Sequence, residues 1–290
     1  MNENYILNKV GKTPIIEVDG ILAKLETTNP TGSVKDRMAW YMVRSAEERG
    51  ELKPGQVILE VTSGNTGIAL SMISAARGYH FIAVMPESMS IERRKMMQSF
   101  GAELILTPAE EDMTGAVNKY NELKKQYPDA WLSNQFTNPD NVKAHEEGLG
   151  KEIVEALNGK VDAFVAAAGT GGTLIGVAKA LKKANPNVYI AVVEPTESAV
   201  ISGGQPGLHG IQGIGEGFIP KILTDNRDII DEVITISTED AKQAREVLAK
   251  KHGVLVGISS GANFLAAKKL KERFENVVTV FADRGERYLS

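Results

Sequence analysis

Short β-branched runs alternate with amphipathic stretches through the first half of the chain. Strand-like runs lie at 57–61 (VILEV), 81–85 (FIAVM) and 103–107 (ELILT), and helices are predicted over about 65–77 and from Ile91 onward. Strands that alternate with helices in this way are typical of a parallel sheet with right-handed crossovers. The first half therefore predicts one α/β unit.

The same alternation returns after Val161 and predicts a second α/β unit. Its strand-like runs are VDAFVAAAG, VYIAVVEP, EVITIS and VVTVFAD, and its helices are predicted over about 173–183, 238–251 and 262–274. A glycine-rich segment at 202–217 is the longest irregular stretch of the chain. Irregular segments of this length in compact α/β proteins more often have a function than serve only as connections, so this one is a candidate functional loop.

Composition narrows the class of protein. The chain has 290 residues, of which 42% are hydrophobic and 24% charged, and this suits a soluble globular protein of two modest domains. The net charge is −4, with lysine and arginine scattered among acids, so a dedicated nucleic-acid binder is not expected. The polar N-terminus contains no long apolar run, so we expect neither a signal peptide nor a membrane span, and a cytoplasmic location.

The chain contains no cysteine, which excludes disulfides, thiolate metal sites and a cysteine nucleophile. The four histidines, His80, His145, His209 and His252, are scattered, and none forms a pair with metal-ligand spacing. No metal site is therefore expected.

A glycine cluster follows the first strand of the second unit. In AAAGTGGTLIG, residues 169–173 would present main-chain N–H groups and the positive end of a helix to an anion, and a phosphate fits such a site. The sequence is neither the dinucleotide fingerprint nor the Gly-Lys-Ser/Thr nucleotide loop. A tight strand-to-helix turn that simply needs glycine is the alternative.

A similar turn lies in the first unit. In EVTSGNTGIAL, hydroxyls, an amide and free N–H groups at a helix start suit a carboxylate, although Ser63 or Asn65 could also be an ordinary helix cap. Two such turns at the carboxyl ends of strands in two α/β units indicate one cleft that holds two anions.

NPTGSVKDR places Lys35 just after a turn, at the start of a helix. The residue lies off the apolar stripe formed by Val34, Met38, Tyr41, Met42 and Ser45, and the helix dipole disfavours a positive charge there. A lysine in this position loses its proton more easily, which suits a nucleophilic amine. A solvated surface lysine is the alternative.

These residues together point to a family. From about Gly11 to Ser290 the chain resembles the O-acetylserine sulfhydrylases (cysteine synthases) and their relatives the cystathionine β-synthases, which are fold-type II pyridoxal-phosphate enzymes. The motifs that carry the resemblance are, in order, NPTGSVKDR, TSGNTG, NQFTNP, GTGGT, QGIGEGFIP, GISSGAN and DRGERYLS.

The resemblance implies a role for each motif. Lys35 would be the catalytic residue and would hold pyridoxal 5'-phosphate as a Schiff base. The cofactor's other ligands would be Gly169, Thr170, Gly171, Gly172 and Thr173 on its phosphate, Asn65 on its 3'-oxygen, and Ser259 on its pyridine nitrogen. The substrate's α-carboxylate would be bound by Thr62, Ser63, Thr66 and Gln135.

The implied reaction forms L-cysteine from O-acetyl-L-serine and sulfide through an aminoacrylate intermediate. The hydroxyl of Ser259 would leave the pyridine nitrogen largely neutral, and the weaker electron sink favours β-replacement over transamination or racemisation. The implied fold has two open twisted sheets flanked by helices, with the cofactor in the cleft between a smaller mobile domain at 36–142 and a larger domain of 1–35 plus 143–290. A homodimer is also implied.

Other activities and partners stay open at this stage. Glu216 stands where the sulfhydrylases usually have a small residue, and a carboxylate there would repel an anionic nucleophile or hold the ammonium group of a second amino acid. A solvated loop glutamate is the plain alternative. The competing activities are a β-synthase or desulfhydrase acting on L-serine or L-cysteine, and an O-phosphoserine-dependent cysteine synthase with Arg37 or Arg93 on the phosphate. A serine acetyltransferase whose tail enters the cleft is a possible partner.

Overall fold

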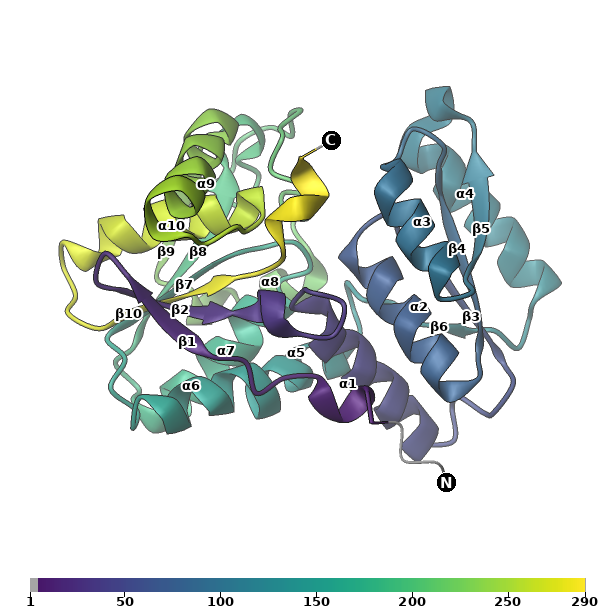
Figure 1. The fold of residues 1–290 in the computed structure, drawn as a ribbon, viewed down its shortest axis with the longest axis horizontal. Coiled ribbons are helices and arrows are strands. Elements are labelled where there is room, and N and C mark those ends of the chain that lie inside the picture. Colours follow the sequence, from purple (N-terminus) through teal and green to yellow (C-terminus); the bar gives the residue numbers. More distant parts are fainter. Residues whose placement is uncertain (1–4, 290) are drawn as a thin grey trace. The chain divides into compact units, whose positions relative to one another are not determined.

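A computed structural model of the protein describes residues 5–289, which form two compact units. The small unit comprises the chain up to Val10 together with Lys35–Asn134, and the large unit comprises Gly11–Val34 and the chain from Gln135 onward. Each unit is an open sheet with helices on both faces, as the alternation of strands and helices predicts (Figure 1). The α/β fold class is confirmed.

The small unit has a four-stranded parallel sheet in the order β5-β4-β3-β6. Apolar side chains of α1, α2 and α3 pack on one face and those of α4 on the other, because successive strand residues point to opposite faces. The strands are β3 (Val57–Val61), β4 (His80–Pro86), β5 (Glu103–Thr107) and β6 (Trp131–Leu132), and the helices are α1 (Lys35–Glu48), α2 (Asn65–Arg77), α3 (Ile91–Ser99) and α4 (Asp112–Gln126).

The large unit has a six-stranded sheet in the order β1-β2-β10-β7-β8-β9, parallel except for the β1–β2 hairpin. Its strands are β1 (Ile15–Val18), β2 (Ile21–Leu25), β7 (Ala163–Ala167), β8 (Tyr189–Pro195), β9 (Glu232–Ile236) and β10 (Val277–Phe281). Its α-helices are α5 (Pro139–Ala144), α6 (Lys151–Ala156), α7 (Gly172–Ala184), α8 (Lys221–Thr224), α9 (Thr238–His252) and α10 (Ile258–Lys271).

Helices α9 and α10 cover one face of this sheet, and α5 to α8 pack on the other. A π-helical turn, η4 (His145–Gly150), joins α5 to α6. The 3-10 turns of the chain are η1 (Leu7–Lys9), η2 (Glu26–Thr28), η3 (Ala109–Glu111), η5 (Thr196–Ser198), η6 (Arg227–Ile229) and η7 (Gly285–Tyr288).

Most predicted elements occur at their predicted places, with one informative difference. The helix predicted over 262–274 begins at Ile258 instead, so Ser259 lies in the first turn of α10. The earlier start follows from a tertiary contact, because the N–H of Gly257 donates to the carbonyl of Asp283 at 3.0 Å.

The boundary between the two units, as their internal contacts define it, differs slightly from the predicted range 36–142 of the smaller domain. The segment 135–142 lies with the large unit, where Asn141 hydrogen-bonds to Thr170. The described residues 5–10 lie with the small unit, because Leu7 is buried in its core. The mobility of the smaller domain stays a prediction.

Candidate active site

The two glycine-containing loops found in the sequence occupy equivalent positions in their sheets. After β3 the chain moves to β4 and β5 on one side, and it returns to the other side of β3 as β6. After β7 it moves to β8 and β9, and it returns to the other side of β7 as β10. The loop at the carboxyl end of β3 or β7 therefore lies at the topological switch point of its sheet, where α/β proteins bind ligands.

The loop after β7, residues 169–173, is packed so closely that its glycines cannot be replaced without movement. Gly171 has a φ of +85°, which only glycine adopts easily. A Cβ at Gly169 would lie 2.4 Å from the carbonyl oxygen of Gly213, and a Cβ at Gly172 would lie 2.0 Å from Oδ1 of Asn141. The tight turn therefore needs glycine at these positions for steric reasons. This does not conflict with the interpretation that the loop binds an anion.

Both threonines of this loop contact buried side chains that sequence reasoning missed. Asn141 donates from Nδ2 to Oγ1 of Thr170 at 3.0 Å, and His145 lies with Nε2 3.2 Å from Oγ1 of Thr173. Asn141 lies on α5, and His145 begins the π-helical turn that follows. The sequence did contain one signal: Asn138 is a helix cap followed by Pro139, so Asn141 and His145 share one helical face.

The loop after β3 lies between β3 and α2 in the small unit. The N–H of Thr62 continues the strand pairing by donating to Val84 O at 3.1 Å, and its Oγ1 accepts from the N–H of Gly67 at 3.1 Å. Thr62 and Thr66 are buried and Ser63 is half-buried. The structure therefore brings together the three predicted carboxylate ligands of this unit.

Arg93 is a further charged group beside this loop. A Cβ built on Gly64 would lie 4.0 Å from Nη1 of Arg93, whose side chain is largely buried. The sequence suggested Arg93 only as a phosphate partner; the structure places its guanidinium next to the loop predicted to bind a carboxylate. A buried cation at this distance raises the local potential for an anion.

Three helices that carry predicted site residues begin at a glycine, which has no side chain to cap them. The N-cap residues of α2, α7 and α10 are Gly64, Gly171 and Gly257, and among the described residues no acid lies in the first turn of these helices. By contrast, α3, α5 and α9 are capped by Ser90, Asn138 and Ser237. Thr62 and Thr170, in the loops before α2 and α7, each accept one N–H of the first turn, and the positive dipole at such a helix start suits an anion.

The residue before Lys35 and the turn that carries Ser259 attach to the same strand end. The N–H of Val34 donates to Ala282 O at 2.8 Å, and the N–H of Ala282 donates to Oγ of Ser260 at 3.0 Å. An antiparallel bridge pairs Ser33 with Asp283. Lys35, which is half-buried, is bonded directly to Val34 and is the first residue of α1.

The C-terminal motif DRGERYLS holds the turn that precedes Lys35. Arg284 donates from Nε to Thr27 O at 2.9 Å and from its N–H to Gly32 O at 3.1 Å, and Arg287 donates to Thr31 O. Gly32 has a φ of +84°, and a Cβ there would lie 2.7 Å from Cδ of Arg284. The two motifs at opposite ends of the chain therefore form one compact turn.

Gln135 and Glu216 lie in segments hydrogen-bonded to the loop after β7 or to residues that contact it. Gln135 is buried, and its main-chain oxygen accepts from Asn141 Nδ2 at 2.8 Å. Glu216 is exposed and follows Gly215, whose N–H donates to Ala168 O at 3.1 Å. This hydrogen bond holds the glycine-rich segment 202–217 beside the loop 169–173, which favours a functional role for the segment.

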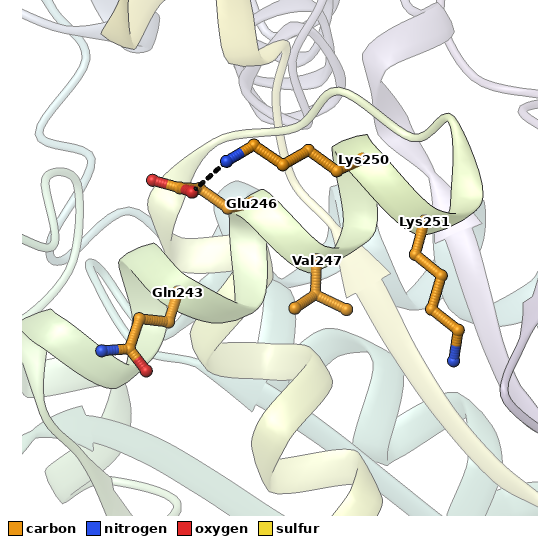
Figure 2. A pocket seen from close by; sticks show the side chains of 5 residues that line it. All are labelled: Gln243, Glu246, Val247, Lys250 and Lys251. Carbon is orange, nitrogen blue, oxygen red and sulfur yellow. Dashed lines mark hydrogen bonds and ion pairs between the residues drawn. The ribbon is translucent and has the colours of Figure 1, made fainter.

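A separate surface hollow contains none of the predicted site residues. Figure 2 shows Gln243, Glu246, Val247, Lys250 and Lys251 of α9, which line it, with Glu246 paired to Lys250 at 2.7 Å. The hydrogen bond from Lys250 lowers the pKa of the Glu246 carboxyl. Paired charges on an exposed helix face are ordinary surface features.

Two further searches concern only the part of the chain that the structure describes. Over residues 5–289, no group of three or more His, Asp or Glu side chains is arranged to hold a metal ion. None of the helices described is long and apolar enough to cross a membrane.

Comparison with known proteins identifies the family. Residues 6–283 match the family described as pyridoxal-phosphate dependent enzyme, and the chain belongs to it. A cysteine synthase of Staphylococcus aureus is 47% identical, over 97% of this chain and 94% of that protein.

Solved structures show the same fold. The cysteine synthase of Entamoeba histolytica has a TM-score of 0.94 at 44% identity, covering 98% of this chain and 88% of that one. A hydrogen sulfide-producing enzyme of Fusobacterium nucleatum has a TM-score of 0.93 at 41% identity, covering 98% and 97%.

The residues of the large unit suit the phosphate of this family's cofactor. The helix start at Gly172 has a glycine N-cap and, in the described structure, no acid in its first turn, three of residues 169–173 are glycines, and the other two are threonines with hydroxyl groups. A phosphate dianion needs hydrogen-bond donors and positive potential, and this loop supplies both. The protein is a pyridoxal-phosphate dependent enzyme.

Proposed function

We propose that the protein is a cysteine synthase that forms L-cysteine from O-acetyl-L-serine and sulfide. The observation that carries the proposal is Lys35 itself, at the start of α1 and directly after a segment hydrogen-bonded to the strand end that also holds the Ser259 turn. The identity of 47% to a cysteine synthase over nearly the whole chain supports the same reaction.

In this proposal the residues predicted from the sequence serve one cofactor. Lys35 would bond it covalently, residues 169–173 would hold its phosphate, Asn65 its 3'-oxygen and Ser259 its pyridine nitrogen. When bound, pyridoxal phosphate supplies an electron sink that stabilises the charge left after a proton leaves the substrate's α-carbon. The chain's own residues then decide which bond breaks next.

Lys35 moves that proton. As a neutral amine it would take the proton from the substrate's α-carbon, and the acetate would leave the β-carbon. Val34 is hydrogen-bonded to Ala282, the residue after β10, so the backbone at Lys35 is held in place. This limits how far the amine can move from the reacting atom.

The small unit binds the substrate's α-carboxylate. Thr62, Ser63 and Thr66 lie at or just before the start of α2, and Gln135 would add an amide. Donors at a helix start bind a carboxylate by hydrogen bonds and by the helix dipole together. The nearby guanidinium of Arg93 strengthens this potential.

Ser259 favours β-replacement over other reactions of the same cofactor. A hydroxyl next to the pyridine nitrogen does not hold a proton on it as a carboxylate would. The cofactor ring would then be a weaker electron sink. The negative charge at the α-carbon would be relieved mainly by loss of the β-substituent. The burial of Ser259 keeps water from competing for that nitrogen.

A second candidate is sulfide release, or a β-synthase reaction, with L-cysteine or L-serine as substrate. The observation that favours it is Glu216, an exposed acid in the segment tied to Ala168. A structure of similar fold is a hydrogen sulfide-producing enzyme. An O-phosphoserine-dependent synthase is less well supported, because Arg93 lies beside the predicted carboxylate loop.

We also propose a homodimer in the cytoplasm and retain serine acetyltransferase as a possible partner. Light scattering after gel filtration checks the dimer, and fractionation of cells checks the location. Titration with a peptide of the acetyltransferase tail checks the partner. A peptide that neither binds nor competes with O-acetylserine would end that part of the proposal.

The test of the reaction is spectroscopic. The visible spectrum of the purified protein is recorded, O-acetyl-L-serine is added, then sulfide, and the series is repeated with L-serine and L-cysteine. We expect the ester alone to change the cofactor's absorbance and sulfide to restore it with cysteine formed. If only cysteine or serine changes the spectrum, the second candidate replaces the first. Lys35→Ala protein that still turned over would refute both.

A further inference from the structure

We propose that Asn141 and His145 are positioning residues that turn the hydroxyl protons of Thr170 and Thr173 toward the cofactor's phosphate. The inference deepens the proposed function and rests on it, because it takes residues 169–173 as the phosphate-binding loop. Asn141 and His145 contact the hydroxyls of these threonines and act on the phosphate through them.

The argument begins with the lone pairs of Thr170. Its Oγ1 accepts one hydrogen bond from Nδ2 of Asn141 at 3.0 Å and another from the N–H of Gly172 at 3.3 Å. A hydroxyl has two acceptor positions and one donor. Since both acceptor positions are taken, the O–H of Thr170 can only donate, and a phosphate dianion can only accept.

Asn141 is held so that it cannot exchange its donor for an acceptor. The side chain is fully buried, and its other Nδ2 hydrogen goes to the main-chain oxygen of Gln135 at 2.8 Å. Both amide hydrogens are thereby used, because an asparagine amide has two. The absence of a side chain at Gly172 leaves room for Oδ1, since a Cβ there would lie 2.0 Å away.

His145 makes the corresponding contact with Thr173. Its Nε2 lies 3.2 Å from Oγ1, and the buried ring begins the π-helical turn His145–Gly150. Such turns often occur at functional sites. Helix α7 approaches this turn closely at Gly176, where a Cβ would lie 2.6 Å from Cβ of His145. We assign the ring hydrogen to Nε2, and this tautomer leaves the O–H of Thr173 free to donate outward.

One short segment therefore connects two parts of the site. Gln135, a predicted carboxylate ligand, and Thr170, a predicted phosphate ligand, share the two hydrogens of a single amide. Loss of the Asn141 donor should consequently weaken the binding of the cofactor first, and raise the KM for O-acetylserine as a second effect.

The decisive variant is Asn141→Asp, which keeps the shape but presents an acceptor to Thr170. The hydroxyl would then donate to the new carboxylate and turn away from the phosphate. Apoprotein is titrated with pyridoxal phosphate, and binding is followed by tryptophan fluorescence. We expect the dissociation constant to rise at least about tenfold, the equivalent of ~1.4 kcal/mol, and the phosphorus-31 resonance of the bound cofactor to shift.

Asn138→Asp is the matched control for the added charge. It lies on the cap of the same helix, and its carboxylate can still accept from the N–H of Asp140, which Asn138 now binds at 2.9 Å. We expect its dissociation constant to stay within about twofold of wild type, a difference of less than ~0.5 kcal/mol. Circular dichroism of each apoprotein checks that the fold is kept.

A double-mutant cycle separates positioning from a merely structural role. Thr170→Val removes the donor and Thr170→Ser keeps it, so only the valine variant should lose affinity. If Asn141 acts through Thr170, adding Asn141→Asp to Thr170→Val should weaken binding little further. His145→Gln, which keeps an N–H near Nε2, should likewise retain more affinity than His145→Leu.

The outcomes are distinguishable. Tight binding by Asn141→Asp with an unchanged phosphorus-31 shift would overturn the inference alone. Full additivity in the cycle would do the same, because the two residues would then act independently. Wild-type protein that took up no pyridoxal phosphate would overturn the proposed function together with the inference.

Discussion

The main-chain N–H of Val34 donates to the carbonyl oxygen of Ala282 at 2.8 Å, and this bond holds the residue that precedes Lys35, the predicted catalytic lysine. The strand end that accepts it also receives Ser33 in a bridge and holds the first turn of α10 through Ser260. The backbone just before Lys35 is therefore held by the carboxyl end of β10, an interior strand of the large unit's sheet.

Gly32→Ala should disturb that arrangement. The residue has a φ of +84°, and the new Cβ would lie 2.7 Å from Cδ of Arg284. Gly50→Ala is the control, because Gly50 has a φ of +72° with no atom within 4 Å of the Cβ position. We expect the control to lose about 1–2 kcal/mol of unfolding free energy from the backbone alone. Gly32→Ala should lose more, and kcat for cysteine formation should fall only in this variant.

Ser63→Ala should weaken substrate binding without affecting the cofactor. A hydrogen bond to a carboxylate contributes about 1.5–3 kcal/mol, so the KM for O-acetylserine should rise roughly 10- to 100-fold. The dissociation constant for pyridoxal phosphate should not change. Ser99→Ala removes an exposed hydroxyl on α3 that donates to Lys95 O, and it should leave both constants unaltered. An unchanged KM in Ser63→Ala would remove Ser63 from the carboxylate site.

Ser259→Asp should alter the course of the reaction. A carboxylate beside the pyridine nitrogen would keep that nitrogen protonated and strengthen the electron sink. We expect cysteine formation to slow by at least about tenfold, roughly 1.4 kcal/mol in the barrier, and transamination products to appear in a chromatographic assay. Ser259→Ala serves as the control without the charge. If it produced the same side products, the electronic explanation would be wrong.

Glu216→Ala should favour an anionic nucleophile. Removal of an exposed like charge changes an interaction by up to about 1 kcal/mol, so kcat/KM for sulfide should rise about threefold to fivefold at low salt. The gain should shrink as ionic strength increases. Glu239→Ala makes the same change of net charge on α9 and should have no such effect. A lower rate with sulfide would instead favour the β-synthase or desulfhydrase activity.

Tyr79 should make the small unit less stable at alkaline pH. Burial and a hydrogen bond to Glu47 raise the pKa of Tyr79 above its ordinary value. Because the unfolded tyrosine titrates near pH ~10, this stabilisation is complete below that pH and is lost as the pH rises toward the folded pKa. Urea unfolding is measured at pH 8 and pH 11, values that bracket ~10. Between them Tyr79→Phe should lose less free energy of unfolding than wild type. The exposed Tyr5→Phe control should follow wild type.

The sequence was most informative where function depends on local backbone chemistry. Strand runs, helix starts and the glycines at 169–172 lie next to one another in the chain, so their spacing predicts the α/β class and both anion-binding loops. Met38 and Met42, which lie on the predicted apolar stripe of the helix that begins at Lys35, are buried in the small unit. These features need no knowledge of distant contacts, because hydrophobic periodicity and helix-end geometry are properties of short segments.

Long-range partners were not predictable in the same way. The start of α10 at Ile258 depends on Asp283, and the turn before Lys35 depends on Arg284. Lys24 is a buried strand residue whose charge is balanced by Glu152 at 2.5 Å. No local pattern identifies such pairs, since a buried polar group is stable only when folding brings its partner to it.

The sequence by itself determined the fold class, the lysine, the two glycine-containing loops and the family that they indicate. Only the tertiary structure decided which side chains orient those groups: Asn141 and His145 on the threonines, Arg93 beside the carboxylate loop, and Ala282 on the residue before the lysine. The physical reason is that a motif specifies which donors and acceptors are present, whereas their direction is set by neighbours that only the folded chain supplies.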